Sequence, residues 1–141
     1  MPEVVSIQFT QDQARTLTGV SVETVRHWRK TVPYLSSKTG KAARFTFAEL
    51  LGLAVAHELV HSFGVHIATL STSIDELFRM LATNGPASLE GTVVFITATE
   101  VTFHEMEADG LSKVPEKSAF MVPLAPLMTG IQRHMLPAMP S

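Results

Sequence analysis

The sequence predicts an α+β fold, with four helices and a short β-hairpin in the first half and a small antiparallel β extension in the second. Apolar residues recur at helical spacing up to residue 82. A polar segment containing glycine interrupts the helices near residue 40. Beyond residue 90 the composition changes, and the segment 92–97 is a β-branched run. We therefore predict three units: residues 1–64, a connecting helix at 65–83, and a β-rich extension at 84–141.

Two short helices joined by a tight turn are predicted at the start of the chain. Thr10 is a good N-cap for a helix at 11–17, and Ser21 for a second helix at about 21–30. Gly19 suits a left-handed turn residue between them. The second helix has three apolar residues on one face: Val22, Val25 and Trp28. Two helices with such a turn form the helix-turn-helix pattern.

The opposite face of helix 21–30 carries cations and hydrogen-bond donors. DNA phosphates and base edges need such groups from a helix inserted into the major groove. The candidate DNA-binding side chains here are Ser21, Thr24, Arg26, His27, Arg29 and Lys30. The competing interpretation is an ordinary solvated helix face, which the surrounding architecture disfavours. Trp28 shares the apolar face and is expected to pack in the core rather than stack on bases.

Residues 34–46 are predicted to form a hairpin, or wing, around the polar turn at 36–41. Tyr34 and Leu35 would begin it, and the strand ending at Phe45 would close it. Three cations of this segment would neutralise phosphates that flank the major groove. They are Lys38, Lys41 and Arg44. The alternative is a solvated hairpin without DNA contacts.

Two further helices are predicted at about 47–63 and 66–82. Thr46 caps the first, Glu49 lies in its first turn, and Gly64 follows its end. The second has an apolar face that needs a cover, formed among others by Ile74, Leu77, Phe78 and Leu81. We therefore predict a homodimer held by residues beyond about 66.

The extension is predicted to form two or three antiparallel strands, at 92–97, 100–107 and 120–122, and a short helix at about 127–135. Pro123 makes the last strand an edge strand at best. Two strands alone are marginally stable, so the sheet must pack on a helix or on a second subunit.

The first half of the chain resembles the winged-helix DNA-binding domain of the MerR-type transcriptional regulators, over about residues 9–82. The segments that carry the resemblance are GVSVETVRHW, GKAARF and FAELLGLAVAHELVHSFGV. The family positions are filled by Ser21, Thr24, Arg26, Trp28, Arg44, Phe45, Glu49, Leu50 and Gly64. The resemblance implies a second helix in the major groove, a DNA-contacting Arg44, and dimers on inverted repeats.

This chain departs from the family pattern in two respects. Ala43 stands where an aromatic residue usually precedes the wing arginine, and strands replace the long helix through which relatives dimerise. The promoter-untwisting mechanism of the family is therefore not implied. Simple repression fits equally well, as does a phage-type architectural role in excision or packaging.

Charge is distributed unevenly along the chain. Residues 1–47 hold seven cations and three anions, whereas residues 48–141 hold four cations and ten anions. The balances of +4 and −6 make up the net charge of −2. A basic head on DNA and an acidic remainder away from it would produce this asymmetry.

One motif supports a different class of function. His57, Glu58 and His61 match the pattern H-E-x-x-H of zinc hydrolases, and His66 is a candidate third ligand. The same segment is already explained as the third helix, so we predict no enzyme activity, catalytic residue, metal or cofactor. A protein-interaction module that no longer binds DNA is the other alternative.

The chain has 141 residues, no cysteine, no apolar segment of membrane-spanning length and no signal-like start. We expect a cytoplasmic bacterial or phage protein whose partners are double-stranded DNA, a second copy and an effector or protein of unknown chemistry. The sequence leaves the operator, the regulated genes, the sign of regulation and the effector undetermined.

Overall fold

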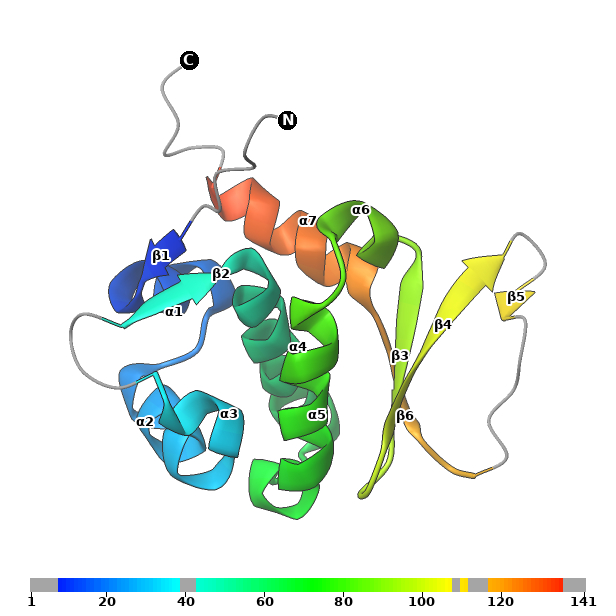
Figure 1. Ribbon diagram of the computed structural model, residues 1–141, viewed down its shortest axis with the longest axis horizontal. Helices are drawn as coiled ribbons and strands as arrows, with labels where there is room; N and C mark the ends of the chain where they lie inside the picture. The colour runs from blue at the N-terminus through cyan, green and yellow to red at the C-terminus, as the bar shows by residue number, and fades with distance from the viewer. Residues whose placement is uncertain (1–7, 39–42, 108–109, 112–116, 136–141) are drawn as a thin grey trace.

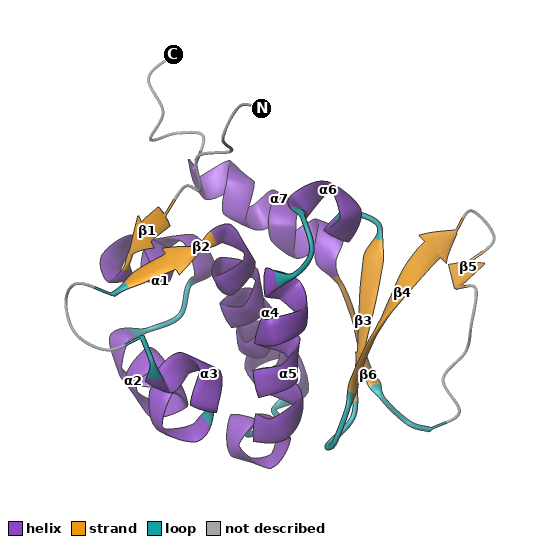
Figure 2. Cartoon of the chain, viewed as in Figure 1, coloured by secondary structure: helices purple, strands orange, loops and turns teal. Residues whose placement is uncertain are grey.

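The computed structural model describes residues 8–38, 43–107, 110–111 and 117–135. A helical part packs against a four-stranded antiparallel sheet, which confirms the predicted mixture of helix and sheet (Figures 1 and 2). The longer helices are α1 (Gln11–Thr18), α2 (Val22–Thr31), α4 (Phe47–Phe63), α5 (Ser71–Ala82) and α7 (Leu124–Met135). Single turns are α3 (Pro33–Ser36), η1 (Ile67–Leu70) and α6 (Pro86–Leu89). The strands are β1 (Gln8–Thr10), β2 (Arg44–Thr46), β3 (Thr92–Ile96), β4 (Val101–Glu107), β5 (Gly110–Leu111) and β6 (Phe120–Pro123).

The first two helices begin and end within one residue of the predicted bounds. Thr10 and Gln13 form a capping box on α1, in which each side chain accepts a hydrogen bond from the other's backbone N–H. Gly19 ends α1 with φ of 79°, a left-handed conformation that glycine adopts without steric cost. Ser21 caps α2 by accepting from the N–H of Thr24. Local side chains therefore determine both helices.

The predicted third helix is confirmed as α4, and the fourth is divided. Thr46 and Glu49 form a second capping box, and Gly64 ends α4 with φ of 66°. The segment expected as one helix at 66–82 begins with the 3-10 turn η1 and continues as α5. Thr69 causes this tightening, because its N–H and its hydroxyl both donate to the carbonyl of His66.

The predicted hairpin at 34–46 is wrong in its first strand. Tyr34 and Leu35 lie in the helical turn α3, and β2 pairs instead with β1, with Phe45 opposite Phe9. Pro33 begins the turn because its fixed φ suits the first helical position. Asp75 of α5 then caps it by accepting from the Tyr34 N–H at 2.6 Å. Residues 39–42 of the predicted wing, with Lys41, lie outside the described residues.

The predicted antiparallel sheet is confirmed, with strand order β5-β4-β3-β6. It has four described strands instead of two or three, because the short strand β5 was not predicted. Among the described strands, β6 lies at the edge of the sheet, as Pro123 required, and pairs with β3. One face of the sheet contacts α5 and α7, and α7 also lies across α1 and α4 (Figure 1). The extension therefore packs on helices of its own chain.

The apolar face of α5 is covered within the chain. The argument that a second subunit must cover this face is therefore wrong. Ile74, Leu77 and Leu81 are fully buried, and Phe78 is 1% exposed. Their neighbours are α3, α4 and the sheet. Helices α4 and α5 approach so closely at Gly52 that a Cβ there would lie 2.4 Å from Phe78 Cε1.

A single hydrophobic cluster extends from Phe9 to Ile131 and includes residues of all three predicted units. Its members come from α1, α2, α4, α5, the sheet and α7. The unit boundaries at residues 64 and 83 stay a prediction. None of the described helices combines the length and apolar character that a membrane span requires.

Candidate nucleic-acid interface

Helix α2 has a buried apolar face and an exposed basic face. Val25 and Trp28 are 2% and 3% exposed, and both belong to the hydrophobic cluster. The tryptophan therefore packs in the core, as predicted. Arg26, His27 and Lys30 are exposed on the other side of the helix. The apolar contacts thus fix which side of α2 is presented to solvent, and that side is cationic.

Two hydroxyl residues lie at the N-terminal end of this face. Ser21 Oγ accepts from the Thr24 N–H and donates to Thr24 Oγ1, which is 2.8 Å away. Ser21 is therefore committed largely to capping the helix. The Thr24 hydroxyl can still donate to an outside acceptor such as a phosphate or a base edge.

Arg29 turns toward α1 instead of projecting freely. Its Nη2 donates to Gln11 Oε1 at 2.6 Å, and its Nε is buried without a hydrogen-bond partner among the described residues. Burial lowers the pKa of Arg29, and the nearby charge of Arg26 lowers it further. Arg29 therefore joins α1 to α2. Gln11 was not predicted to take part, since no spacing rule relates residues on two different helices.

The three predicted wing cations fall into different places. Arg44 is exposed on β2, opposite Thr10 of β1, and its Nη1 donates to the carbonyl of Ala43 at 3.2 Å. Lys38 points inward, and its Nζ lies 3.1 Å from Glu49 Oε2 and 2.9 Å from the Arg44 carbonyl. Lys41 lies outside the described residues.

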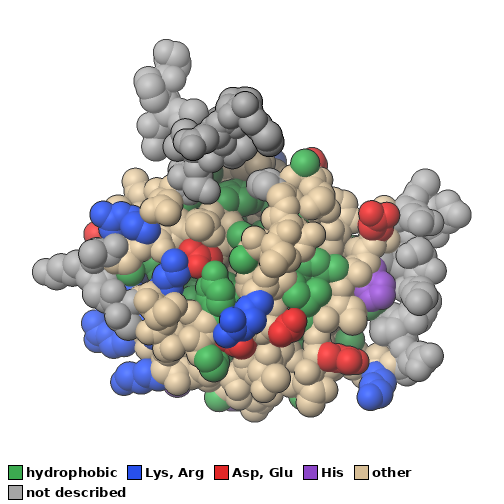
Figure 3. Space-filling view, in the orientation of Figure 1, with side chains coloured by type: hydrophobic (Ala, Val, Ile, Leu, Met, Phe, Trp, Pro, Cys, Tyr) green, Lys and Arg blue, Asp and Glu red, His purple; other side chains and the backbone are tan. Residues whose placement is uncertain are grey.

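The cationic surface gathers on the helix-turn-helix side of the molecule. In Figure 3 most of the Lys and Arg side chains lie over the part formed by α1, α2 and β2, and most Asp and Glu side chains lie toward α5 and the sheet. The charge asymmetry of the sequence is therefore also an asymmetry in space. A phosphate backbone is attracted to the first side and repelled from the second.

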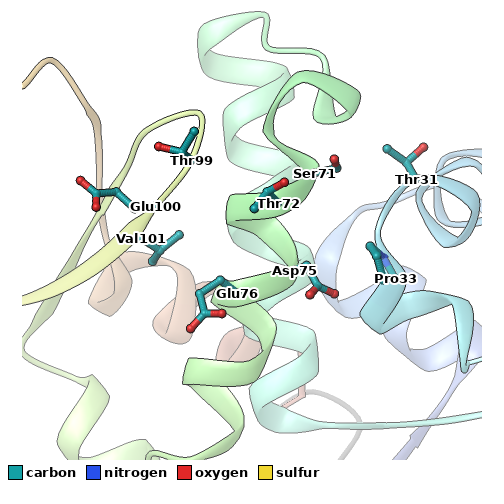
Figure 4. A pocket seen from close by; sticks show the side chains of 9 residues that line it. All are labelled: Thr31, Pro33, Ser71, Thr72, Asp75, Glu76, Thr99, Glu100 and Val101. Atoms are coloured by element: carbon teal, nitrogen blue, oxygen red, sulfur yellow. The ribbon is translucent and has the colours of Figure 1, made fainter.

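A cleft of about 490 Å³ lies along α5, between the end of α2 and the turn before β4 (Figure 4). Asp75 and Glu76 of α5 line it, and so does Glu100 in the turn before β4. Asp75 is occupied by Tyr34 N–H and by Arg79, whose Nε lies 3.0 Å from Oδ2. The cleft is acidic, so it does not extend the surface for DNA.

The H-E-x-x-H segment lies on α4 without the features of a catalytic metal site. His57 is half-buried and His61 is exposed, with ring centroids 4.1 Å apart. Burial lowers the pKa of His57, and the charge of His61 adds to this effect. Glu58 accepts a hydrogen bond from Ser62, and His66 lies beside His27 in another hollow. In the part of the chain that is described, no group of three His, Asp or Glu residues could hold a metal.

Comparison with protein families matches residues 9–77, just under half of the chain, to the MerR HTH family regulatory proteins. The matched segment begins at β1 and ends in α5, so it contains both helices of the helix-turn-helix and strand β2. Comparisons with curated proteins and with solved structures gave no match.

Proposed function

With a MerR-type helix-turn-helix region at residues 9–77 as the premise, we propose that this chain is a sequence-specific regulator that inserts α2 into the major groove of duplex DNA. One observation carries the proposal: the core buries Val25 and Trp28 and thereby presents Arg26, His27 and Lys30 to solvent. The matched family is one of helix-turn-helix regulatory proteins, which supports this proposal.

The dimensions and chemistry of α2 support this docking. An α-helix with its side chains is about 10–12 Å in diameter, so the major groove, about 12 Å wide, admits it. The ten residues of α2 span about 15 Å along the axis, at a rise of roughly 1.5 Å each. Arg26 can form two hydrogen bonds with a guanine edge, and Thr24 can reach a phosphate or a base. Arg44, with Lys41, would contact the flanking backbone.

We propose further that two copies bind an inverted repeat. A single recognition helix reads only a few base pairs, which leaves little affinity at physiological salt. Two helices related by a two-fold axis, roughly 34 Å apart, would read both half-sites. The covered face of α5 does not supply the interface, because its apolar residues are buried in their own chain.

Selection from a random duplex library, followed by fluorescence anisotropy over a series of salt concentrations, tests the DNA proposal. We expect one enriched sequence that binds at least about a thousandfold tighter than random duplex. Equal affinity for all duplexes, or no binding, would overturn sequence-specific recognition. No binding by a folded protein would favour the interaction-module alternative.

Light scattering of the free protein and of its complex with the selected duplex tests the dimer. We expect two chains per duplex and a selected site with two-fold symmetry. A monomer that binds an asymmetric site tightly would overturn the dimer and leave the DNA proposal intact.

A further inference from the structure

Lys38 makes three contacts with its own chain. Its ammonium lies 2.9 Å from the carbonyl of Arg44, 3.1 Å from Glu49 Oε2, and 6.0 Å from the ring centroid of Phe45. The side chain is only 25% exposed. A lysine that contacts phosphate from a surface loop is normally solvated, so this geometry indicates a different role.

Glu49 explains why the ammonium is held inside. Its carboxylate is 3% exposed, and three groups from different segments bind it. Oε1 accepts from the Thr46 N–H at 2.7 Å, and Oε2 accepts from the Tyr34 hydroxyl at 2.8 Å as well as pairing with Lys38. A buried carboxylate without a compensating cation is strongly destabilising. If Lys38 turned away to bind a phosphate, the buried Glu49 carboxylate would lose its compensating cation and the fold would be destabilised.

The same ammonium holds the backbone of the residue expected to contact DNA. Arg44 begins β2, where it pairs with Thr10 next to the first turn of α1. The bond from Lys38 Nζ to the Arg44 carbonyl joins the end of α3 to the start of β2. It therefore restrains the backbone from which the Arg44 guanidinium projects.

We propose that Lys38 is a positioning residue, not a phosphate ligand: paired with buried Glu49, it fixes the Arg44 backbone so that the Arg44 side chain contacts the DNA backbone. This inference rests on the proposed function. It replaces the assignment of Lys38 as a phosphate contact, which the sequence alone favoured. It also divides the cations of the interface into those that contact DNA directly and Lys38, which acts through Arg44.

A double-mutant cycle on the full chain distinguishes the two roles. Lys38→Met keeps an apolar stem over Phe45 and removes the charge. We expect Lys38→Met and Arg44→Ala each to weaken binding to the selected duplex about tenfold, as for one charge-assisted contact. We also expect each to reduce the salt slope by about 0.9, because both remove the same phosphate contact. The double variant should bind no worse than Arg44→Ala.

Lys30 supplies the matched control, since it is exposed on α2 and has no ion-pair partner among the described residues. Lys30→Met combined with Arg44→Ala should show additive losses, as expected for independent phosphate contacts. Additive losses for Lys38→Met with Arg44→Ala, with the salt slope reduced by about 1.8, would overturn the positioning role.

A second variant tests the same proposal by rescue. In Lys38→Met/Glu49→Gln the buried charge is gone, while the amide oxygen can accept from Thr46 N–H and the amide NH₂ can donate to the Tyr34 hydroxyl. Because the bond from Lys38 Nζ to the Arg44 carbonyl is still absent, we expect this variant to recover the thermal stability lost in Lys38→Met but not the DNA affinity. Recovery of the DNA affinity as well would show that the loss in Lys38→Met came from the uncompensated Glu49 carboxylate, and it would overturn the positioning of Arg44 through its carbonyl.

Thermal unfolding of the same variants separates this inference from the proposed function. If the wild-type protein binds no duplex, the proposed function fails, and with it the role of Lys38 in positioning Arg44 for DNA. The Lys38–Glu49 pair is still tested: Lys38→Met should lower the melting temperature, and Glu49→Gln added to it should raise the temperature again. If the wild type binds normally but the losses of Lys38→Met and Arg44→Ala are additive, only the inference on Lys38 is overturned.

Discussion

Helices α2 and α5 are both amphipathic, and the protein uses them in opposite ways. α2 has ten residues, buries Val25 and Trp28, and presents a cationic face. α5 has twelve residues, and its apolar face is enclosed by α3, α4 and the sheet. Its polar face carries Asp75 and Glu76, which line the acidic cleft. An apolar stripe thus shows that a helix will be buried on one side, and the charge of the other side shows whether DNA can approach.

The largest expected effect is on α5. Phe78→Ala removes a fully buried ring that stacks on Tyr34 at a centroid distance of 5.2 Å, so we expect a loss of about 3–5 kcal/mol in unfolding free energy. Urea unfolding at two protein concentrations is the measurement. Because the ring is covered within its own chain, the loss should be the same at both concentrations. A loss that varies with protein concentration would assign the α5 face to a subunit interface. Glu76→Ala, at an exposed position of the same helix, is the control and should change the unfolding free energy little.

The second prediction concerns the packing between α4 and α5. Gly52→Ala places a Cβ within 2.4 Å of Phe78 Cε1, and such overpacking costs about 1–3 kcal/mol. Helix propensity alone would favour alanine over glycine by roughly 1 kcal/mol, so the two effects have opposite signs. Calorimetry or urea unfolding of Gly52→Ala measures whether the cost of overpacking exceeds the gain in helix propensity. Gly130→Ala, with open space around its Cβ position on α7, is the matched control and should not destabilise the protein.

The third prediction concerns α2. Arg26→Ala should weaken binding to the selected duplex by about 1–3 kcal/mol and relax the preference at one base position. Stability should change little, because Arg26 is exposed. Anisotropy with duplexes substituted at single positions is the measurement. Equal losses on all duplexes would make Arg26 a phosphate contact, and no loss would remove α2 from the interface.

The smallest expected effect is at Tyr34 of α3, whose hydroxyl donates a hydrogen bond to Glu49 of α4. Burial, together with the hydrogen bond to Glu49, raises the pKa of Tyr34 from its usual 10.0 to about 12. The folded protein therefore holds this proton more tightly than the unfolded chain. The stability it contributes is complete below pH 10 and is lost as the pH rises toward 12.

Tyr34→Phe tests this contribution. It should cost about 0.5–1.5 kcal/mol at neutral pH, as for one hydrogen bond. It should also remove part of the loss in stability between pH 10 and 12. Unfolding curves at a series of pH values for both proteins provide the comparison. An unchanged pH dependence in the variant would mean that Tyr34 does not control it.

Local sequence determined the start and end of each helix of the helix-turn-helix and of α4. Thr10 with Gln13, Ser21 with Thr24, and Thr46 with Glu49 act within one turn, and Gly19 and Gly64 act on their own backbone. Capping and left-handed turns depend on neighbours three or four residues away, so their patterns are readable directly. The apolar face of α2, and with it the outward direction of Arg26 and Lys30, followed from the same periodicity.

Tertiary structure decided what covers each apolar face and which cations pair within the chain. Tyr34 lies in α3 and not in a strand because Asp75, forty-one residues away, caps the turn and Phe78 stacks on the ring. Lys38 pairs with Glu49 because packing buries that carboxylate beside it, and Arg29 turns to Gln11 on another helix. Periodicity describes one element at a time, whereas the energy of a buried charge or ring depends on atoms brought together from distant parts of the chain.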